Sequence, residues 1–417
     1  MMGRRVQRFL LGLVVLPVIF LIASAESACA AEPSSAWTNI VRILSLRDYN
    51  VRVVVFGTTL LGCAAGMVGS FTLLRKRALM GDALSHATLP GICLAFIITA
   101  NMGGSGKSLL VLLAGATVTG LLGVGMILTM NRFTRLKEDT ALGAVLSVFF
   151  GGGIALLGIV QQMKSGHAAG LESFIYGKTA SMGMADIQLI SIAALICIIS
   201  ALFLFKELKL LCFDDDFASS RGFPVLFLDI WLMVLVVIVT IVGLQAVGLI
   251  LMVALLIIPA AAARFWTEKL GPMFFISGGI GALSGWLGAA TSAIFSRLPS
   301  GAMIVLVCTA MFGISMIFGR KRGLVVRLNK RAKLNRSTRR QHLLRAMFEL
   351  SEQSTTIDQD NAPETWPAVN IDDLVRKRSW SRNRLWKEIR YAQMDGLVTW
   401  VGDQVRLNKR GALEAAR

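Results

Sequence analysis

Long apolar runs separated by short polar connections make up most of the chain between residues 51 and 318. About twenty consecutive apolar residues form a helix that can cross a bilayer. The sixth and seventh runs are nearly continuous, and we divide them at Gly243-Leu244-Gln245 because one helix of their joint length would far exceed a single crossing. The pattern predicts an all-α polytopic membrane protein with about nine transmembrane helices, at 51–74, 82–101, 108–130, 141–161, 186–205, 224–243, 247–263, 271–291 and 300–318.

The pattern changes after residue 319, where a stretch rich in Arg, Lys, Asn and Ser predicts a basic linker over 319–340. Helical periodicity then recurs three times and is followed by alternating apolar residues on either side of a Gly402-Asp403 turn. This order of elements is typical of a winged helix-turn-helix, so we expect a small domain of that kind over 341–417. Its elements are expected at 342–351, 371–377, 381–394 and 397–407.

The first thirty residues have the order of a secretory signal peptide. Three arginines precede an apolar run over 9–23, and the small-x-small sequence Ala28-Cys29-Ala30 follows. We therefore expect 1–30 to be a cleaved signal peptide, with an uncleaved N-terminal anchor helix as the alternative.

Composition and charge support a membrane location. Hydrophobic residues make up 55% of the 417 residues and charged residues 16%, below the roughly 25% usual in soluble domains, which excludes an ordinary soluble enzyme. The net charge is +18, and cations gather in alternate connections, which the positive-inside rule places in the cytoplasm. We expect a multi-pass protein of the inner (plasma) membrane with a cytoplasmic C-terminal domain. The cation-rich connections are 75–77, 132–137, 206–221, 264–269 and 320–322.

Asp82 and His86 are the clearest candidates for chemistry. They lie four residues apart in an apolar run, so both fall on one face of a helix, one turn apart. Ionisable groups inside a membrane are costly and usually face a cavity, a partner or a pathway. A carboxylate and an imidazole on one face form a half-site for a divalent transition metal. The alternative is that both simply pair with the Arg75–Arg77 cluster.

The sequence around this pair, residues 73–91, resembles the signature of the manganese/zinc/iron permeases of ABC-type importers. Residues 137–143 and 243–264 resemble two further stretches of that family, and the resemblance covers about 50–318 in order. It implies a transmembrane permease domain over 50–318 that imports divalent Mn, Zn or Fe ions. It also implies that Asp82 and His86 help coordinate the transported metal, with no tightly bound cofactor.

A second motif lies in the connection 213–224, where Asp214, Ala218 and Gly222 are spaced four apart. This spacing gives one stripe of a short helix, and the alternative is an acidic solvated loop. The connection resembles the loop through which such permeases contact their ATPase. The resemblance therefore implies cytoplasmic ABC ATPase subunits as partners, an extracytoplasmic metal-binding protein, and a dimer with a second permease copy or paralogue among membrane lipid.

We do not expect the chain to be an enzyme. Residues 103–108 nearly match a P-loop, but Asn101 stands where the pattern requires its first glycine. ATP hydrolysis is therefore expected from a separate subunit.

The expected C-terminal domain carries a basic helix, which resembles, with its neighbours, metal-dependent repressors of the manganese/iron type. Cations on the second helix of a helix-turn-helix are placed to meet phosphates and base edges. DNA is therefore one candidate partner, and docking to protein or anionic lipid is the alternative. The cations concerned are Arg382, Arg384, Lys387 and Arg390.

Two further functions compete with the importer hypothesis. One is a membrane-tethered DNA-binding regulator whose tail carries the function, and the other is a secondary metal transporter that needs no ATPase. The metal itself is left open, since His with a carboxylate suits Mn, Fe and Zn alike.

Overall fold

The computed structural model of the protein divides into two compact units, Met1–Leu324 and Val325–Arg417, each with its own hydrophobic core. The expected signal peptide or anchor over 1–30 lies outside the residues that the structure describes. The described residues are 49–415 except for 78, 103–107, 164–176, 178, 180–181, 295–298, 355–365 and 379.

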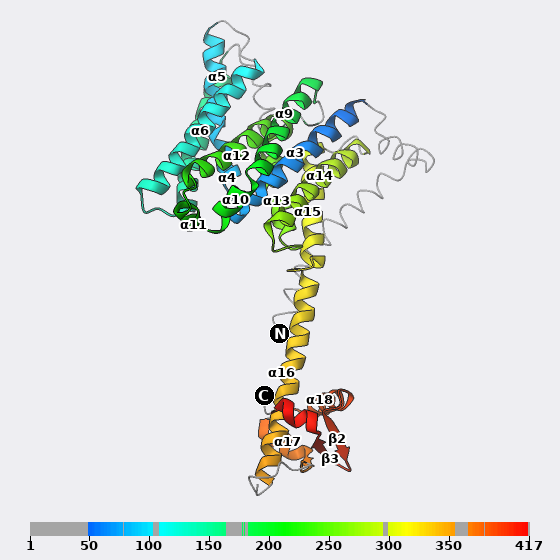
Figure 1. The fold of residues 1–417 in the computed structure, drawn as a ribbon. Helices are drawn as coiled ribbons and strands as arrows, with labels where there is room; N and C mark the ends of the chain where they lie inside the picture. Colours follow the sequence, from blue (N-terminus) through cyan, green and yellow to red (C-terminus); the bar gives the residue numbers. More distant parts are fainter. Residues whose placement is uncertain are drawn as a thin grey trace, which may run out of the picture. The chain divides into compact units, whose positions relative to one another are not determined.

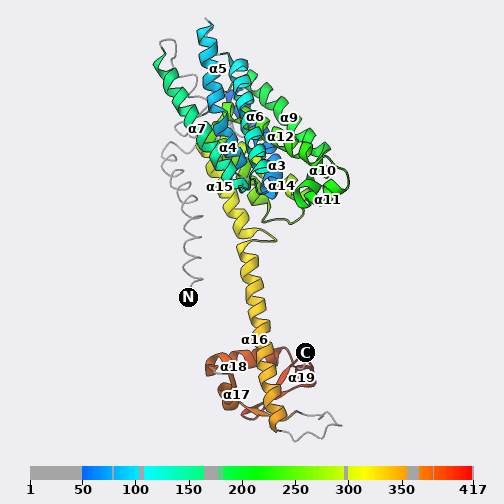
Figure 2. The ribbon, with the colours of Figure 1, turned by 90° about the vertical axis from the view of Figure 1, so that its left-hand side faces the viewer.

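The first unit is entirely helical in its described residues, and the nine expected segments all form helices. Among the described residues, seven single helices and the stretch Met80–Asn101 taken as one span are long and apolar enough to cross a membrane, whereas α13 has 15 residues. The second expected segment is divided at Thr88 into α4 and α5. Figures 1 and 2 both show α5 beside α6. The helices are α3 (Tyr49–Leu74), α4 (Met80–Ala87), α5 (Leu89–Asn101), α6 (Leu109–Phe133), α7 (Glu138–Gln162), α9 (Met184–Phe203), α10 (Phe205–Phe213), α11 (Asp215–Ser220), α12 (Val225–Val247), α13 (Leu249–Ala263), α14 (Leu270–Ile294) and α15 (Ser300–Phe318).

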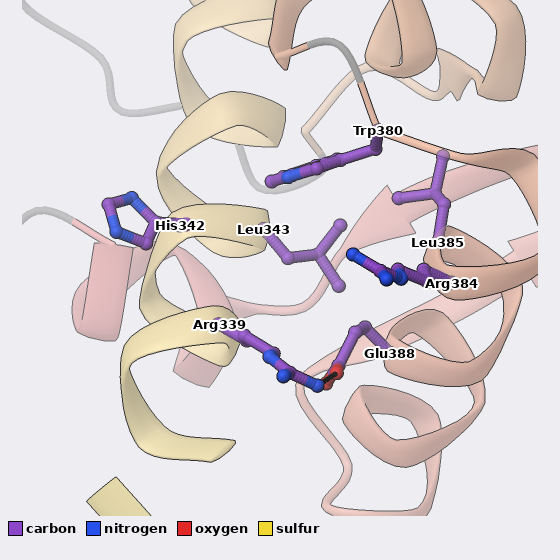
Figure 3. Close-up of a pocket in the computed structure, with 7 residues that line it drawn as sticks. All are labelled: Arg339, His342, Leu343, Trp380, Arg384, Leu385 and Glu388. Atoms are coloured by element: carbon purple, nitrogen blue, oxygen red, sulfur yellow. Dashed lines mark hydrogen bonds and ion pairs between the residues drawn. The ribbon is translucent and has the colours of Figure 1, made fainter. Parts of the chain in front are cut away.

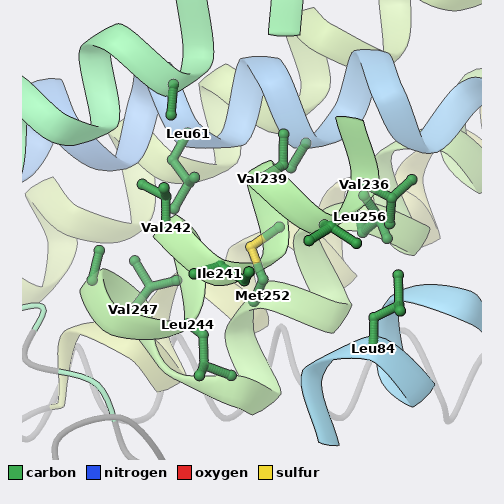
Figure 4. Packing of buried hydrophobic residues seen from close by; sticks show 14 of the residues in the cluster. Leu61, Leu84, Val236, Val239, Ile241, Val242, Leu244, Val247, Met252 and Leu256 are labelled. Carbon is green, nitrogen blue, oxygen red and sulfur yellow. The ribbon is translucent and has the colours of Figure 1, made fainter. Parts of the chain in front are cut away.

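The break between α12 and α13 lies at Gly248, so the expected division at 243–245 is wrong. Gly248 has a φ of +86°, a conformation that glycine adopts without steric cost. Gly243 stays helical, and its missing side chain lets the Met252 side chain of α13 pack against the α12 backbone. After Gly248 the chain turns back, so that α13 packs against α12. Figure 4 shows apolar residues of these two helices packed together, with Leu84 of α4 nearby.

Helices α3 and α14 pack backbone to backbone. A Cβ placed on either Gly62 or Gly281 would come closer than 3.0 Å to the carbonyl oxygen of the other residue. One turn further along, the Ser277 hydroxyl donates to the Gly66 carbonyl at 2.6 Å. Small residues allow this close approach and are typical of helix contacts inside membranes. The α3–α14 pair therefore forms a central support of the first unit.

The second unit has the expected order of helices and hairpin. The three helices and the strand pair are found, with Gly402 in the hairpin turn at a φ of +64°. A short strand, β1, adds to a three-stranded antiparallel sheet of order β1-β3-β2. The elements are α16 (Leu324–Ser354), β1 (Val369–Asn370), α17 (Ile371–Arg378), α18 (Arg382–Met394), β2 (Val398–Val401), β3 (Gln404–Leu407) and α19 (Lys409–Ala415).

The basic segment expected as a linker over 319–340 is helical from Leu324 onward, as the first part of α16. No glycine or proline interrupts 324–354, and its Leu, Arg, Lys and Ala residues favour helix. Its second half, through Leu344 and Met347, packs into the core of the unit. The composition that suggested a linker describes the solvent-exposed first half of a continuous helix.

Candidate functional site

Asp82 and His86 share one face of α4, as expected. Their closest side-chain atoms, His86 Nε2 and Asp82 Oδ1, are 3.5 Å apart, with the side chains 18% and 36% exposed respectively. The His86 ring meets Phe150 of α7 edge-on, with centroids 4.6 Å apart. His86 Nδ1 is buried and has no hydrogen-bond partner among the described residues. The pair thus presents a carboxylate and an imidazole together at a partly accessible position.

Helix α4 is short but lies deep among its neighbours, in contact with α6, α7, α12 and α13. Gly81 faces Leu256 of α13 so closely that a side chain would not fit without movement. The Ser85 hydroxyl donates to the Gly81 carbonyl at 2.7 Å and so stays within the helix. These contacts fix the rotation of α4 and therefore the direction of Asp82 and His86.

Asp82 and His86 offer two potential metal ligands and no more. Among the described residues, no group of three or more His, Cys, Asp or Glu side chains could hold a metal. Sites with four protein ligands retain zinc as a structural metal. A carboxylate with one imidazole can offer coordination that water or another ligand must complete, so the ion can leave again.

The Arg75–Arg77 cluster pairs with acidic residues other than Asp82. Asp229 of α12, 6% exposed, accepts from Arg75 Nη2 at 2.9 Å and from Arg77 Nη1 at 2.6 Å. Arg75 Nη1 also meets Asp215 of α11 at 2.5 Å. Lys76 lies between the two arginines at a φ of +61°, ending α3 where glycine is usual. The alternative that Asp82 and His86 merely pair with this cluster is therefore not what the structure shows.

This ionic network joins α3, α11 and α12 just before α4 begins. Burial lowers the pKa of Arg75, but the hydrogen bond to Asp215 and the charges of Asp229 and Asp215 outweigh it and raise the pKa above its ordinary value. Arg75 also donates to the Leu211 carbonyl at 2.8 Å. Sequence reasoning missed the network, although an aspartate inside the apolar run 224–243 signals a partner.

The second motif forms a capped turn of helix. Asp214 is the N-cap of α11 and accepts from the Phe217 amide at 2.9 Å. Gly222 ends it at a φ of +81°, and the amide of the next residue, Phe223, donates to the Ala218 carbonyl at 3.1 Å, a Schellman-type end. Ala218 is fully buried within the chain. The expected ATPase contact at Asp214, Ala218 and Gly222 stays a prediction, with the Ala218 side chain packed inward within this chain.

Exposed aromatic side chains lie within α11 and on either side of it. Phe213 is 62% exposed, Phe217 49% and Phe223 39%. Aromatic residues are enriched in protein interfaces, so these three are the better candidates for contact with another subunit. The spacing-based argument overlooked them because it followed only the four-residue stripe.

Replacing Gly222 by valine should weaken assembly with the ATPase, whereas asparagine should be tolerated. A new Cβ would meet nothing within 4 Å, so the cost is the left-handed backbone, about 1–2 kcal/mol for most residues and less for Asn. We expect about 5- to 30-fold less ATPase co-purified with Gly222→Val. If Gly222→Val and the wild type co-purify equal amounts of ATPase, Gly222 has no role in assembly with the ATPase.

The four basic residues of α18 do not all serve one surface. Lys387 and Arg390 are exposed, and Arg382 pairs with Asp372 of α17 at 3.4 Å. Arg384 instead lines a pocket between α16 and α18. The structure thus leaves Lys387 and Arg390 as the clearest candidates for contact with a polyanion.

The membrane-spanning helices carry a family match. The model of the ABC 3 transport family matches residues 47–319, about two thirds of the chain. The chain belongs to the ABC 3 transport family. It is a multi-pass membrane protein, the permease subunit of an ABC transporter rather than its ATPase. The family match ends before the second unit and does not test the expected winged-helix domain.

Similar proteins in this family come from several bacteria. The manganese transport system membrane protein MntC of Bacillus subtilis is 43% identical over 81% of this chain and 74% of its own length. The zinc transport system membrane protein TroC of Treponema pallidum is 41% identical over 71% of this chain and 97% of its own. Because the first unit, Met1–Leu324, is less than 81% of the chain, the MntC match extends into the second unit. Neither relative supports the resemblance of residues 341–417 to repressors.

Solved structures agree with the fold. The structure titled PsaBC from Streptococcus pneumoniae in complex with Fab matches with a TM-score of 0.58 at 32% identity, over 68% of this chain and 97% of its own. A chain described as a metal-chelate type ABC transporter, in an inward-facing conformation, matches with a TM-score of 0.51 at 16% identity, over 74% of this chain and 98% of its own. The second likeness concerns the fold alone.

Proposed function

We propose that this permease imports Mn²⁺ or Zn²⁺ and that Asp82 and His86 contact the ion on its way. The 3.5 Å pair on α4 carries the proposal, because it places a carboxylate and an imidazole on one partly accessible face. The names of the relatives support a transition metal, and they divide between manganese and zinc at nearly equal identity. Such a pair suits either ion, so selectivity rests on features beyond these two ligands.

The proposed assembly has partners on both sides of the inner membrane. ATP is hydrolysed by cytoplasmic ATPase subunits that dock on the loop around α11, and a separate extracytoplasmic protein delivers the metal. A second permease copy or paralogue completes a dimer, with the second unit of this chain in the cytoplasm. Family membership favours this ATP-driven system over a secondary transporter without an ATPase.

The ionic network offers a route from the docking loop to the metal ligands. Asp215 belongs to α11, while Arg77 stands three residues before α4. Asp229 holds both Arg75 and Arg77. A displacement of α11 on ATP binding would therefore act on the segment that carries Asp82 and His86.

Replacing Asp229 by asparagine should lower metal uptake about tenfold when uptake is divided by the amount of permease in the membrane. Asparagine keeps the shape but removes the charge that two largely buried arginines share, which weakens their hold on α12. Asp216→Asn is the matched control, since Asp216 is exposed on α11. Equal metal uptake by the two variants would show that the ionic network does not connect α11 to Asp82 and His86.

The function itself is tested by uptake. Cells that lack their own importers would express this chain with its candidate ATPase and binding protein and receive labelled Mn, Zn or Fe. We expect accumulation of Mn or Zn that requires all three components. Accumulation without the ATPase, or of no metal at all, would overturn the proposal.

The exposed cations of α18 support a second candidate function, contact of the C-terminal unit with DNA. Lys387 and Arg390 are free of ion pairs among the described residues. Phosphate contacts of this kind weaken steeply with salt. A Lys387→Gln, Arg390→Gln variant that binds duplex DNA as the wild type does would remove this candidate.

A further inference from the structure

The second unit contains a pocket of about 140 Å³ between α16 and α18. Figure 3 shows Leu343 of α16 and Leu385 of α18 inside it, with Trp380 above them and Arg339 and Glu388 below. Its volume is close to that of the roughly 150 Å³ cavity that accommodates benzene in another protein. The pocket therefore has room for one six-membered ring and little more.

The floor of the pocket is apolar. Leu343 is 1% exposed and Leu385 2% exposed, and both belong to the core of the unit. The Trp380 ring packs against that core and presents a flat face to the space beneath it. Aromatic rings prefer offset or edge-to-face contact with such a face. These walls favour a ring over a small hydrated ion.

The rim of the pocket is cationic. Arg339 is held by Glu388, with Nη1 and Oε1 3.4 Å apart, whereas Arg384 makes no ion pair with the described residues. Figure 3 shows the Arg384 side chain reaching into the pocket from α18. A guanidinium binds a carboxylate through two parallel hydrogen bonds. His342, at the edge on α16, adds a further polar group.

The geometry points to a binding site for a small aromatic carboxylate, with its ring between Trp380 and the leucines and its carboxylate on Arg384. This site belongs to the C-terminal unit and goes beyond the proposed transport function. Because the ligand would contact both α16 and α18, its binding would hold these two helices together. The permease thus carries a receptor for a small organic acid that the transport reaction does not use.

A fluorine-labelled probe tests the site on the full chain in lipid nanodiscs. We expect 4-fluorobenzoate to bind with a dissociation constant on the order of 1 mM, as suits a ligand of about ten heavy atoms, measured from its ¹⁹F line width. The neutral 4-fluorobenzamide should bind at least about tenfold more weakly, since it cannot form the charge-assisted pair. Inorganic phosphate should not displace the probe.

Two variants separate the pocket from the general charge of α18. Arg384→Gln should weaken 4-fluorobenzoate binding at least about tenfold. Lys387 lies three residues further along α18 and does not line the pocket, so Lys387→Gln should leave binding unchanged. Both residues are exposed, so neither change should alter the melting temperature of the unit. Equal binding of the amide, displacement by phosphate, or equal loss in the two variants would each overturn the assignment.

Discussion

Permease carrying Asp82→Asn or His86→Gln is expected to accumulate at least about tenfold less Mn or Zn than the wild type, at equal abundance in the membrane. Asparagine keeps the shape of the aspartate but loses the charge that attracts a divalent ion, and glutamine removes the imidazole nitrogen. Loss of a single charged ligand worth 1.4 kcal/mol already costs a factor of ten. Uptake of labelled metal at a concentration well below saturation measures the effect.

Ser85→Ala supplies the control for this experiment. Ser85 lies on the same short helix, is 1% exposed and bonds back to its own turn. We expect the alanine variant to transport normally. If Asp82→Asn and His86→Gln both transport as Ser85→Ala does, the pair is structural and the metal passes elsewhere.

Replacing Gly281 by leucine is expected to abolish the folded permease. The Gly281 position lies so near the Gly62 backbone that even a Cβ requires α3 and α14 to move apart. That displacement would also strain the neighbouring Ser277–Gly66 hydrogen bond. Overpacking a tight contact typically costs about 1–3 kcal/mol, and here backbone rather than a flexible side chain must move. Size-exclusion chromatography of a fluorescent fusion measures the monodisperse fraction.

Gly279→Leu is the matched control on the same helix, because a Cβ at Gly279 would meet nothing within 4 Å. It changes the composition of α14 equally but points away from α3. We expect it to yield folded protein in amounts close to the wild type. Similar losses for both variants would show that any leucine in α14 is harmful, and that the close approach is not the cause.

Local sequence patterns were enough to predict most helices of the permease. Apolar runs of about twenty residues mark the spans, and the i, i+4 spacing alone places Asp82 beside His86. The Gly402-Asp403 turn likewise identifies the hairpin. Each of these features depends on neighbours in sequence, which is why periodicity and turn chemistry reveal them.

The features that were missed depend on contacts between distant residues. Gly243 looks like a helix break in sequence, but it remains helical, and the break lies at Gly248 with a φ of +86°. Ala218 lies on the four-residue stripe of the second motif, but its side chain is buried, which the spacing alone does not show. Asp229 and the two arginines are more than 150 residues apart, and no local pattern reports their meeting.

The separation of Asp229 from its arginines also bears on how the protein is made. Chains are synthesised from the N-terminus at about 5–20 residues per second, so Arg75 and Arg77 emerge well before α12. The network between the end of α3, α11 and α12 can close only when Asp229 has been added. The ion cluster therefore forms only after α12 has been made, and a chain truncated before α12 would leave Arg75 and Arg77 without Asp229.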